Sequence, residues 1–196
     1  MKIRRFAMHL GYSAIAALVL TNPGSSTALA VDDQAHAEHT APRNDGANLL
    51  KVVRESTERF RDVSAAEAEG YRLMFGCVSG PDYGAMGLHY VNLSLVTDGE
   101  LDPTRPEIVI YEPTPNGRPR LIGADFLIFA DAWHAKNPTT TPELMGQLLH
   151  FFEAPNRFGL PPFYTLHVWA WKENPTGAFV NWHSKVSCDA FGGQNP

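Results

Sequence analysis

The chain has 196 residues, of which 44% are hydrophobic and 19% charged. This composition is typical of a globular domain and excludes a disordered chain or a fibrous repeat. Sixteen Lys and Arg residues against 21 Asp and Glu residues give a formal net charge of −5. A mildly acidic chain without a basic run lacks the electrostatic footprint of a nucleic-acid-binding protein. The length favours a single domain.

The first 30 residues have the pattern of an export signal. A basic start, which includes Arg4 and Arg5, precedes the apolar run 14–20, and Ala-Leu-Ala at 28–30 forms a small-residue cleavage site. The apolar run is too short to span a bilayer, so we expect a signal peptide cleaved near Ala30. The mature chain should then be periplasmic or secreted, without a membrane span. Export through the general or the twin-arginine route stays open.

The mature chain is expected to have a flexible tail followed by one domain. Residues 31–46 lack a periodic apolar pattern and are predicted to be a tail, and 47–196 to be a single α+β domain. The domain contains two cysteines, Cys77 and Cys188. In an oxidising compartment such a pair is most simply a disulfide, and the alternatives are two free thiols or two thiolate metal ligands.

Two periodicities divide the domain. Helical spacing of apolar residues predicts a helix over 47–61, and Ser64 to Glu67 has the form of a capping box for a second helix that ends at Gly70. The period then changes to two, which predicts strands. These are expected at 71–78, 88–95, 107–112, 120–129 and 163–171, with 144–152 ambiguous and a last hairpin at 178–182. The predicted fold class is α+β, an N-terminal helical pair packed on a mainly antiparallel sheet or open barrel.

Several short strings in the chain resemble those of a known family. They are GCVSGP at 76–81, GAMGLHYVN at 84–92, YEP at 111–113, PNRFG at 155–159 and LHVWAW at 166–171. As a set they are similar to strings in a family of exported bacterial proteins of unknown function. The resemblance implies secretion and a compact domain, and it supplies neither an activity nor a ligand.

Strand alternation predicts that His89 faces the core. It places His167 on an aromatic-lined face of its strand, opposite the apolar face formed by Leu166, Val168 and Ala170. An Asn116-Gly117 turn would pair Glu112 with Leu121 and Ile108 with Asp125, which places both carboxylates on one apolar face. Acidic groups on such a face are costly to bury unless they are paired or bound to a metal.

One divalent metal ion is therefore the candidate cofactor. The hypothesis takes His89, His167 and Glu112 as ligands, with His150 or Asp125 as a further one. Two alternatives stay open. The histidines can be core residues satisfied by Glu112 and backbone carbonyls, or they can act with the same carboxylate in metal-free acid–base catalysis.

Aromatic residues suggest a second type of pocket. Tyr83, Tyr90, Trp169 and Trp171, together with Phe158 and Phe163, could line a site for a planar or sugar ligand. The alternative is that these side chains fill the interface between sheet and helices.

The functional prediction is an exported soluble protein that binds a small ligand or metal ion in a pocket lined by histidine, carboxylate and aromatic groups. The alternatives are a metal-dependent periplasmic enzyme that uses two histidines and one carboxylate, and a structural envelope protein with no site. The expected partner is a small molecule or metal ion. The sequence leaves catalysis, the identity of the ligand and any protein partner open.

Overall fold

The computed structural model describes residues 44–193. The predicted signal peptide and nearly all of the predicted tail lie outside the described residues. The first helix begins at Asp45, just inside the segment predicted as tail. Within residues 44–193, no helix is both long enough and apolar enough to cross a membrane.

Three short helical elements lead into the sheet: α1 (Asp45–Thr57), η1 (Glu58–Arg61) and α2 (Val63–Ala68). The first predicted helix is therefore an α-helix that tightens into a 3₁₀ turn. The capping box predicted at Ser64 is wrong, because the carboxylate of Asp62 accepts a hydrogen bond from the backbone N–H of Ser64 and caps α2 earlier. Gly70, with φ +97°, follows the helix in the left-handed conformation expected of a C-terminal stop.

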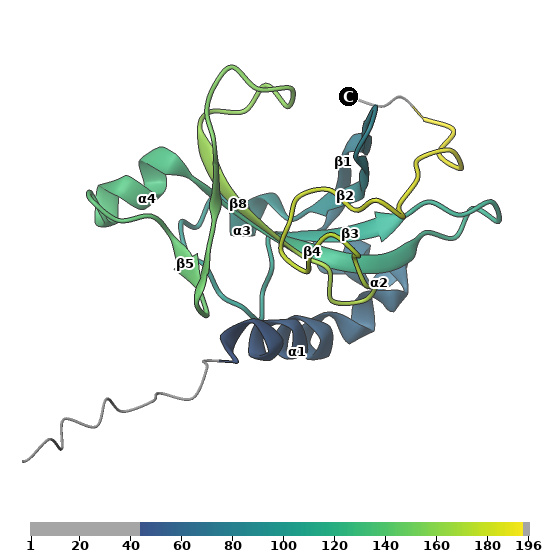
Figure 1. Cartoon of the computed structure of the whole chain (residues 1–196), viewed down its shortest axis with the longest axis horizontal. Helices are drawn as coiled ribbons and strands as arrows, with labels where there is room; N and C mark the ends of the chain where they lie inside the picture. Colours follow the sequence, from purple (N-terminus) through teal and green to yellow (C-terminus); the bar gives the residue numbers. More distant parts are fainter. Residues whose placement is uncertain (1–43, 194–196) are drawn as a thin grey trace, which may run out of the picture. The chain divides into compact units, whose positions relative to one another are not determined.

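The α+β class with an antiparallel sheet is confirmed. Six strands form a strongly curled half-barrel in the order β1-β2-β3-β4-β8-β7, and every neighbouring pair is antiparallel (Figure 1). The strands are β1 (Arg72–Gly80), β2 (Gly84–Val91), β3 (Ile108–Glu112), β4 (Arg120–Phe129), β7 (His150–Phe152) and β8 (Phe163–Val168). A separate small hairpin consists of β5 (Glu143–Leu144) and β6 (Gln147–Leu148).

Several predicted boundaries are wrong for local reasons. The strand predicted to reach residue 95 stops at Val91, because the Asn92 side chain accepts from the Ser94 N–H and starts α3 (Leu93–Val96). Strand β8 ends at Val168 rather than residue 171. The ambiguous segment 144–152 is extended, with turns. Residues 178–182 form no hairpin strand, and α4 (Ala130–Lys136), for which no helix was predicted, follows β4.

The helices cover one face of the sheet. Leu49 and Val53 of α1 belong to the same buried cluster as Leu166 and Val168 of β8, which is the apolar face expected from alternation. Farther along, the hydroxyl of Tyr111 donates to the Phe60 carbonyl at 2.7 Å. On β2, β4 and β8, His89, Asp125 and His167 alternate with these core residues. Their side chains therefore lie on the opposite face of the sheet.

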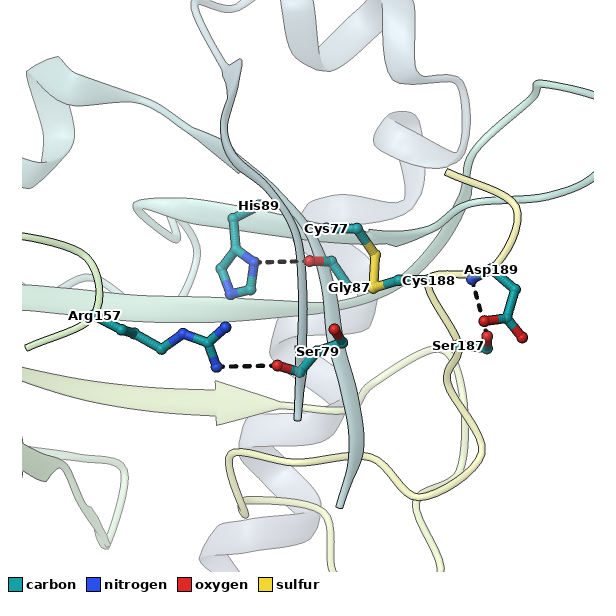
Figure 2. Close-up of a disulfide and its surroundings, with 8 residues drawn as sticks. All are labelled: Cys77, Ser79, Gly87, His89, Arg157, Ser187, Cys188 and Asp189. Carbon is teal, nitrogen blue, oxygen red and sulfur yellow. Dashed lines mark hydrogen bonds between the residues drawn. A yellow bond between two sulfur atoms is a disulfide. The ribbon is translucent and has the colours of Figure 1, made fainter. Parts of the chain in front are cut away.

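The predicted disulfide between Cys77 and Cys188 is confirmed and spans 111 residues (Figure 2). It ties the C-terminal segment to β1, where Cys77 pairs with Leu88 of β2. A second link comes from His183, which forms an isolated β-bridge with Ala85. The C-terminal segment is thus fixed beside the strand that carries His89.

Candidate metal centre

Three buried side chains meet on the open side of the sheet. His89 of β2, Asp125 of β4 and His167 of β8 each offer one ligand atom, and these atoms all lie within 4.8 Å of one another. None of the three residues is more than 5% exposed. Asp125 and His167 are directly paired across β4 and β8, and the curl of the sheet brings His89 towards them across β3. This group can hold a metal ion.

The backbone orients the ring of His89. Its Nδ1 lies 3.1 Å from the Gly87 carbonyl oxygen and points at it in Figure 2. A carbonyl accepts a hydrogen bond, so Nδ1 carries the proton and Nε2 keeps a free lone pair. Gly87 sits at φ +93°, and a Cβ there would lie 2.5 Å from the Tyr111 carbonyl oxygen. Only glycine allows this close approach between β2 and β3.

His167 is buried, and within residues 44–193 neither of its ring nitrogens makes a hydrogen bond of good geometry. Its Nδ1 lies 3.5 Å from Asp125 Oδ1, and the Asn181 side chain acts on the ring as a hydrogen-bonding neighbour. The amide oxygen of Asn181 is likewise buried and unpartnered. An unsatisfied buried polar group costs about 1–3 kcal/mol. A cation bound to the imidazole would offset part of that cost.

The carboxylate of Asp125 is positioned by Thr165, whose hydroxyl donates to Oδ1 in a short hydrogen bond. Thr165 lies two residues before His167 on β8, so both side chains are on the same face of the strand. This face therefore supplies the imidazole of His167 and the hydroxyl that orients Asp125. Such support is typical of residues that hold a metal ligand in place.

Burial sets the charges of the group. It lowers the pKa of His89 to about 4 and that of His167 to about 3. His167 lowers the pKa of His89 further and His150 that of His167, whereas the Asn181 side chain opposes the shift of the His167 pKa. Burial also raises the pKa of Asp125 to about 6, against the opposing influence of His89 and Thr165. Near neutral pH both imidazoles are therefore uncharged and the carboxylate is ionised, which are the forms that bind metal.

The structure places Glu112 elsewhere. Ile108 pairs with Asp125 as predicted, but an irregularity in the β3–β4 pairing beyond Ile110 makes Glu112 face Arg120 instead of Leu121. Its carboxylate accepts hydrogen bonds from Arg120 and, at 2.6 Å, from Lys172 Nζ. Two cations already compensate the charge of Glu112, and Asp125 is the carboxylate that joins the histidines.

His150 lies near the group without entering it. It is exposed on β7, where it pairs with Thr165. Its charge contributes to the lowered pKa of His167. The three-residue group is complete without it.

Of the six aromatic residues predicted for a ligand pocket, Phe158 and Phe163 line the cavity over the metal-ligand group, and the other four lie apart from it. Tyr90 is in the core against Tyr111, because it alternates with His89 and points to the helix-covered face. Tyr83 is 61% exposed, with its ring near Trp182. Trp171 donates to Thr57 at the end of α1. Trp169 lies beside His167, with ring centroids 5.7 Å apart, and it does not line the cavity over the metal-ligand group.

A cavity opens over the group. His89, Asp125, Thr165 and His167 supply its polar lining, and the other eight lining residues are apolar. The cavity has a volume of about 30 Å³. That space suits an ion with a small ligand rather than a large planar molecule.

A buried carboxyl group, Glu107, was missed from the sequence. It is 2% exposed and its Oε2 accepts from the Leu127 N–H at 3.1 Å. Burial raises its pKa to about 8. Alternation offered a clue, since Glu107 shares a face with Val109 and Tyr111, which both point into the core.

Comparisons with protein-family models, curated proteins and solved structures found no match.

Proposed function

We propose that the protein is exported and binds one divalent transition-metal ion through His89, Asp125 and His167. The observation that carries this proposal is the meeting of three buried ligand atoms within 4.8 Å of one another. Two imidazoles and one carboxylate suit zinc, iron and their first-row neighbours. Such a set leaves coordination positions open for water or a small ligand.

The surroundings of the three residues support a metal rather than a packed core. The Gly87 carbonyl orients one imidazole and the Thr165 hydroxyl orients the carboxylate. In metal sites these outer hydrogen bonds fix ring orientation and tautomer. In a packed core without a metal, both ring nitrogens of His167 would be buried without a hydrogen bond of good geometry. Each unsatisfied buried polar group costs free energy.

Export is supported by two independent features. The first 30 residues have the basic, apolar and small-residue order of a signal peptide. The domain also contains the Cys77–Cys188 disulfide, which persists in an oxidising compartment.

Metal-dependent catalysis is the second candidate. The cavity that opens over the ligand group favours it, because a substrate could reach an open coordination position there. Turnover of a substrate by the metal-loaded protein, lost on removal of the metal, would distinguish an enzyme from a binding module.

The test is metal content of the mature chain, purified without an affinity tag and incubated separately with Mn, Fe, Co and Zn salts. We expect about one ion per chain for at least one metal. His89→Ala and His167→Ala should each lower the affinity for the metal more than about a hundredfold. The reason is that loss of a residue that only supports a metal ligand already costs about 10- to 100-fold in metal affinity. The control is His134→Gln, since His134 lies in α4 and bonds Tyr164 instead.

Circular dichroism of each variant shows whether it is folded. Absence of bound metal in the parent, or equal binding by all three variants, would contradict the proposal.

A further inference from the structure

The cavity over the ligand group separates polar from apolar surface. Its polar groups gather at the metal-ligand end, whereas Phe75, Met86, Phe152, Phe158, Leu160 and Phe163 are among its walls. No Lys or Arg lines it, and the described lining contains no acidic residue besides Asp125. A ligand that reaches the metal would therefore have only apolar surface around the rest of its length.

The chain builds part of this wall at a cost. Phe75 has φ +66°, a left-handed conformation unusual for a bulky residue. It lies in an irregularity of β1, where the pairing jumps from Met74–His89 to Cys77–Leu88. Its ring packs edge-on against Phe158 at 5.4 Å and lines the cavity. Strain of this kind persists where the surroundings fix it, and here it places an aromatic ring over the ligand group.

Neither Arg157 nor His150, which lie close to the walls, lines the cavity. Arg157 donates to the Ser79 carbonyl at 3.0 Å (Figure 2). Its guanidinium lies 5.9 Å from the Phe158 ring centroid. His150 is exposed on β7. A second charged group on the ligand would thus be buried without a partner, which is costly.

Charge balance defines the head group. A divalent ion with the Asp125 carboxylate keeps one net positive charge, which a single monoanionic head neutralises. We infer that the cavity accepts a small molecule with one metal-coordinating head and an apolar tail, such as a short aliphatic monocarboxylate, and rejects dianions. This inference rests on the proposed metal site.

Butyrate and succinate form a matched pair of probes, because they have the same chain length and differ in a methyl or carboxylate end. Each is titrated into the Co(II)-loaded mature protein and followed by the visible absorption of the cobalt. Butyrate should bind at least about tenfold more tightly than succinate, since the second carboxylate meets no partner. Equal binding, tighter binding of succinate, or no response to either would overturn the inference.

A variant reverses the preference. Leu160→Lys places an ammonium group at the cavity wall from a partly exposed position, and it should tighten succinate binding about tenfold relative to butyrate. Leu148→Lys, at a 61% exposed residue of β6, is the control and should leave the ratio unchanged. An unchanged ratio in Leu160→Lys would also overturn the inference.

Cobalt content is measured before the titrations. A chain that holds no cobalt, manganese, iron or zinc contradicts the proposed function itself, whereas bound cobalt without the butyrate preference contradicts the ligand class alone.

Discussion

Replacement of Glu107 by Gln should make the protein more stable, increasingly so as the pH rises. Glu107 is buried beside Leu127, and no ion pair accompanies it within residues 44–193. Burial raises its pKa from 4.5 to about 8. The folded protein therefore holds a proton that the unfolded chain releases, so stability is lost as the pH increases through this interval.

The size of the effect follows from the pKa difference. Each unit corresponds to about 1.4 kcal/mol, so the wild type should lose roughly 3–5 kcal/mol between about pH 4.5 and pH 8 through this residue. Gln cannot ionise, and its amide oxygen can still accept from the Leu127 N–H. The stability difference between variant and wild type should thus grow in favour of Gln across this range.

Urea unfolding of both proteins at about pH 5, 6, 7 and 8 measures the difference directly. Contributions from His89, Asp125 and His167 are common to both chains and largely cancel. Glu58→Gln, at an exposed residue, controls for the change in net charge. A stability difference that stays constant over these pH values would refute the assignment of Glu107 as a buried, protonated carboxyl.

Three further predictions concern the frame around the site. Replacing both Cys77 and Cys188 by Ser should lower the unfolding free energy by about 4–5 kcal/mol in the chain-entropy model, and a loss below about 1 kcal/mol in urea unfolding would contradict it. Glu112→Gln should leave metal content unchanged by elemental analysis, since Arg120 and Lys172 bind that carboxylate; metal loss would return Glu112 to the ligand set. Gly87→Ala should cost about 2–4 kcal/mol by thermal unfolding, whereas Gly192→Ala, at an open position, should cost little.

Local sequence pattern was sufficient for the strands that carry the site. Alternation within the last strand placed His167 on the face opposite Leu166 and Val168, and the structure separates them in this way. That His89 and His167 share a face could not be predicted from either strand alone. The Ile108–Asp125 pair was also predicted correctly, although the two-residue Asn116-Gly117 turn from which it was predicted is wrong. Residues 113–119 join the two strands, the Gly117 N–H donates to the Thr114 carbonyl, and the irregularity after Ile110 shifts the register near this loop by one residue.

The choice of carboxylate could not be read from the sequence. Glu112 and Asp125 both appeared on the site face, and only the tertiary structure separates them. Lys172, 60 residues away, neutralises Glu112. The curl of the sheet brings His89 across β3 to Asp125. This curl is a property of all six strands together, so the sequence of a single strand does not predict it.

Single residues also end or interrupt strands at positions where the alternation of apolar residues predicts a continuous strand. The Asn92 side chain ends β2 by capping α3, although the apolar alternation continues to Leu95. Phe75 leaves the regular β1 ladder and enters the cavity wall. Neither a strand-ending cap nor an irregularity of this kind follows from hydrophobic periodicity, since both depend on side-chain and backbone geometry at one position.

The most direct test of the metal site is anomalous X-ray diffraction from crystals of the mature protein soaked in zinc or manganese salts and measured above the absorption edge of the metal. The structure predicts the strongest peak between His89, Asp125 and His167, at about 2.0–2.2 Å from the coordinating nitrogen and oxygen atoms for zinc. A metal-soaked crystal with no peak at these three residues, or with peaks solely at histidines elsewhere in the chain, would contradict the site.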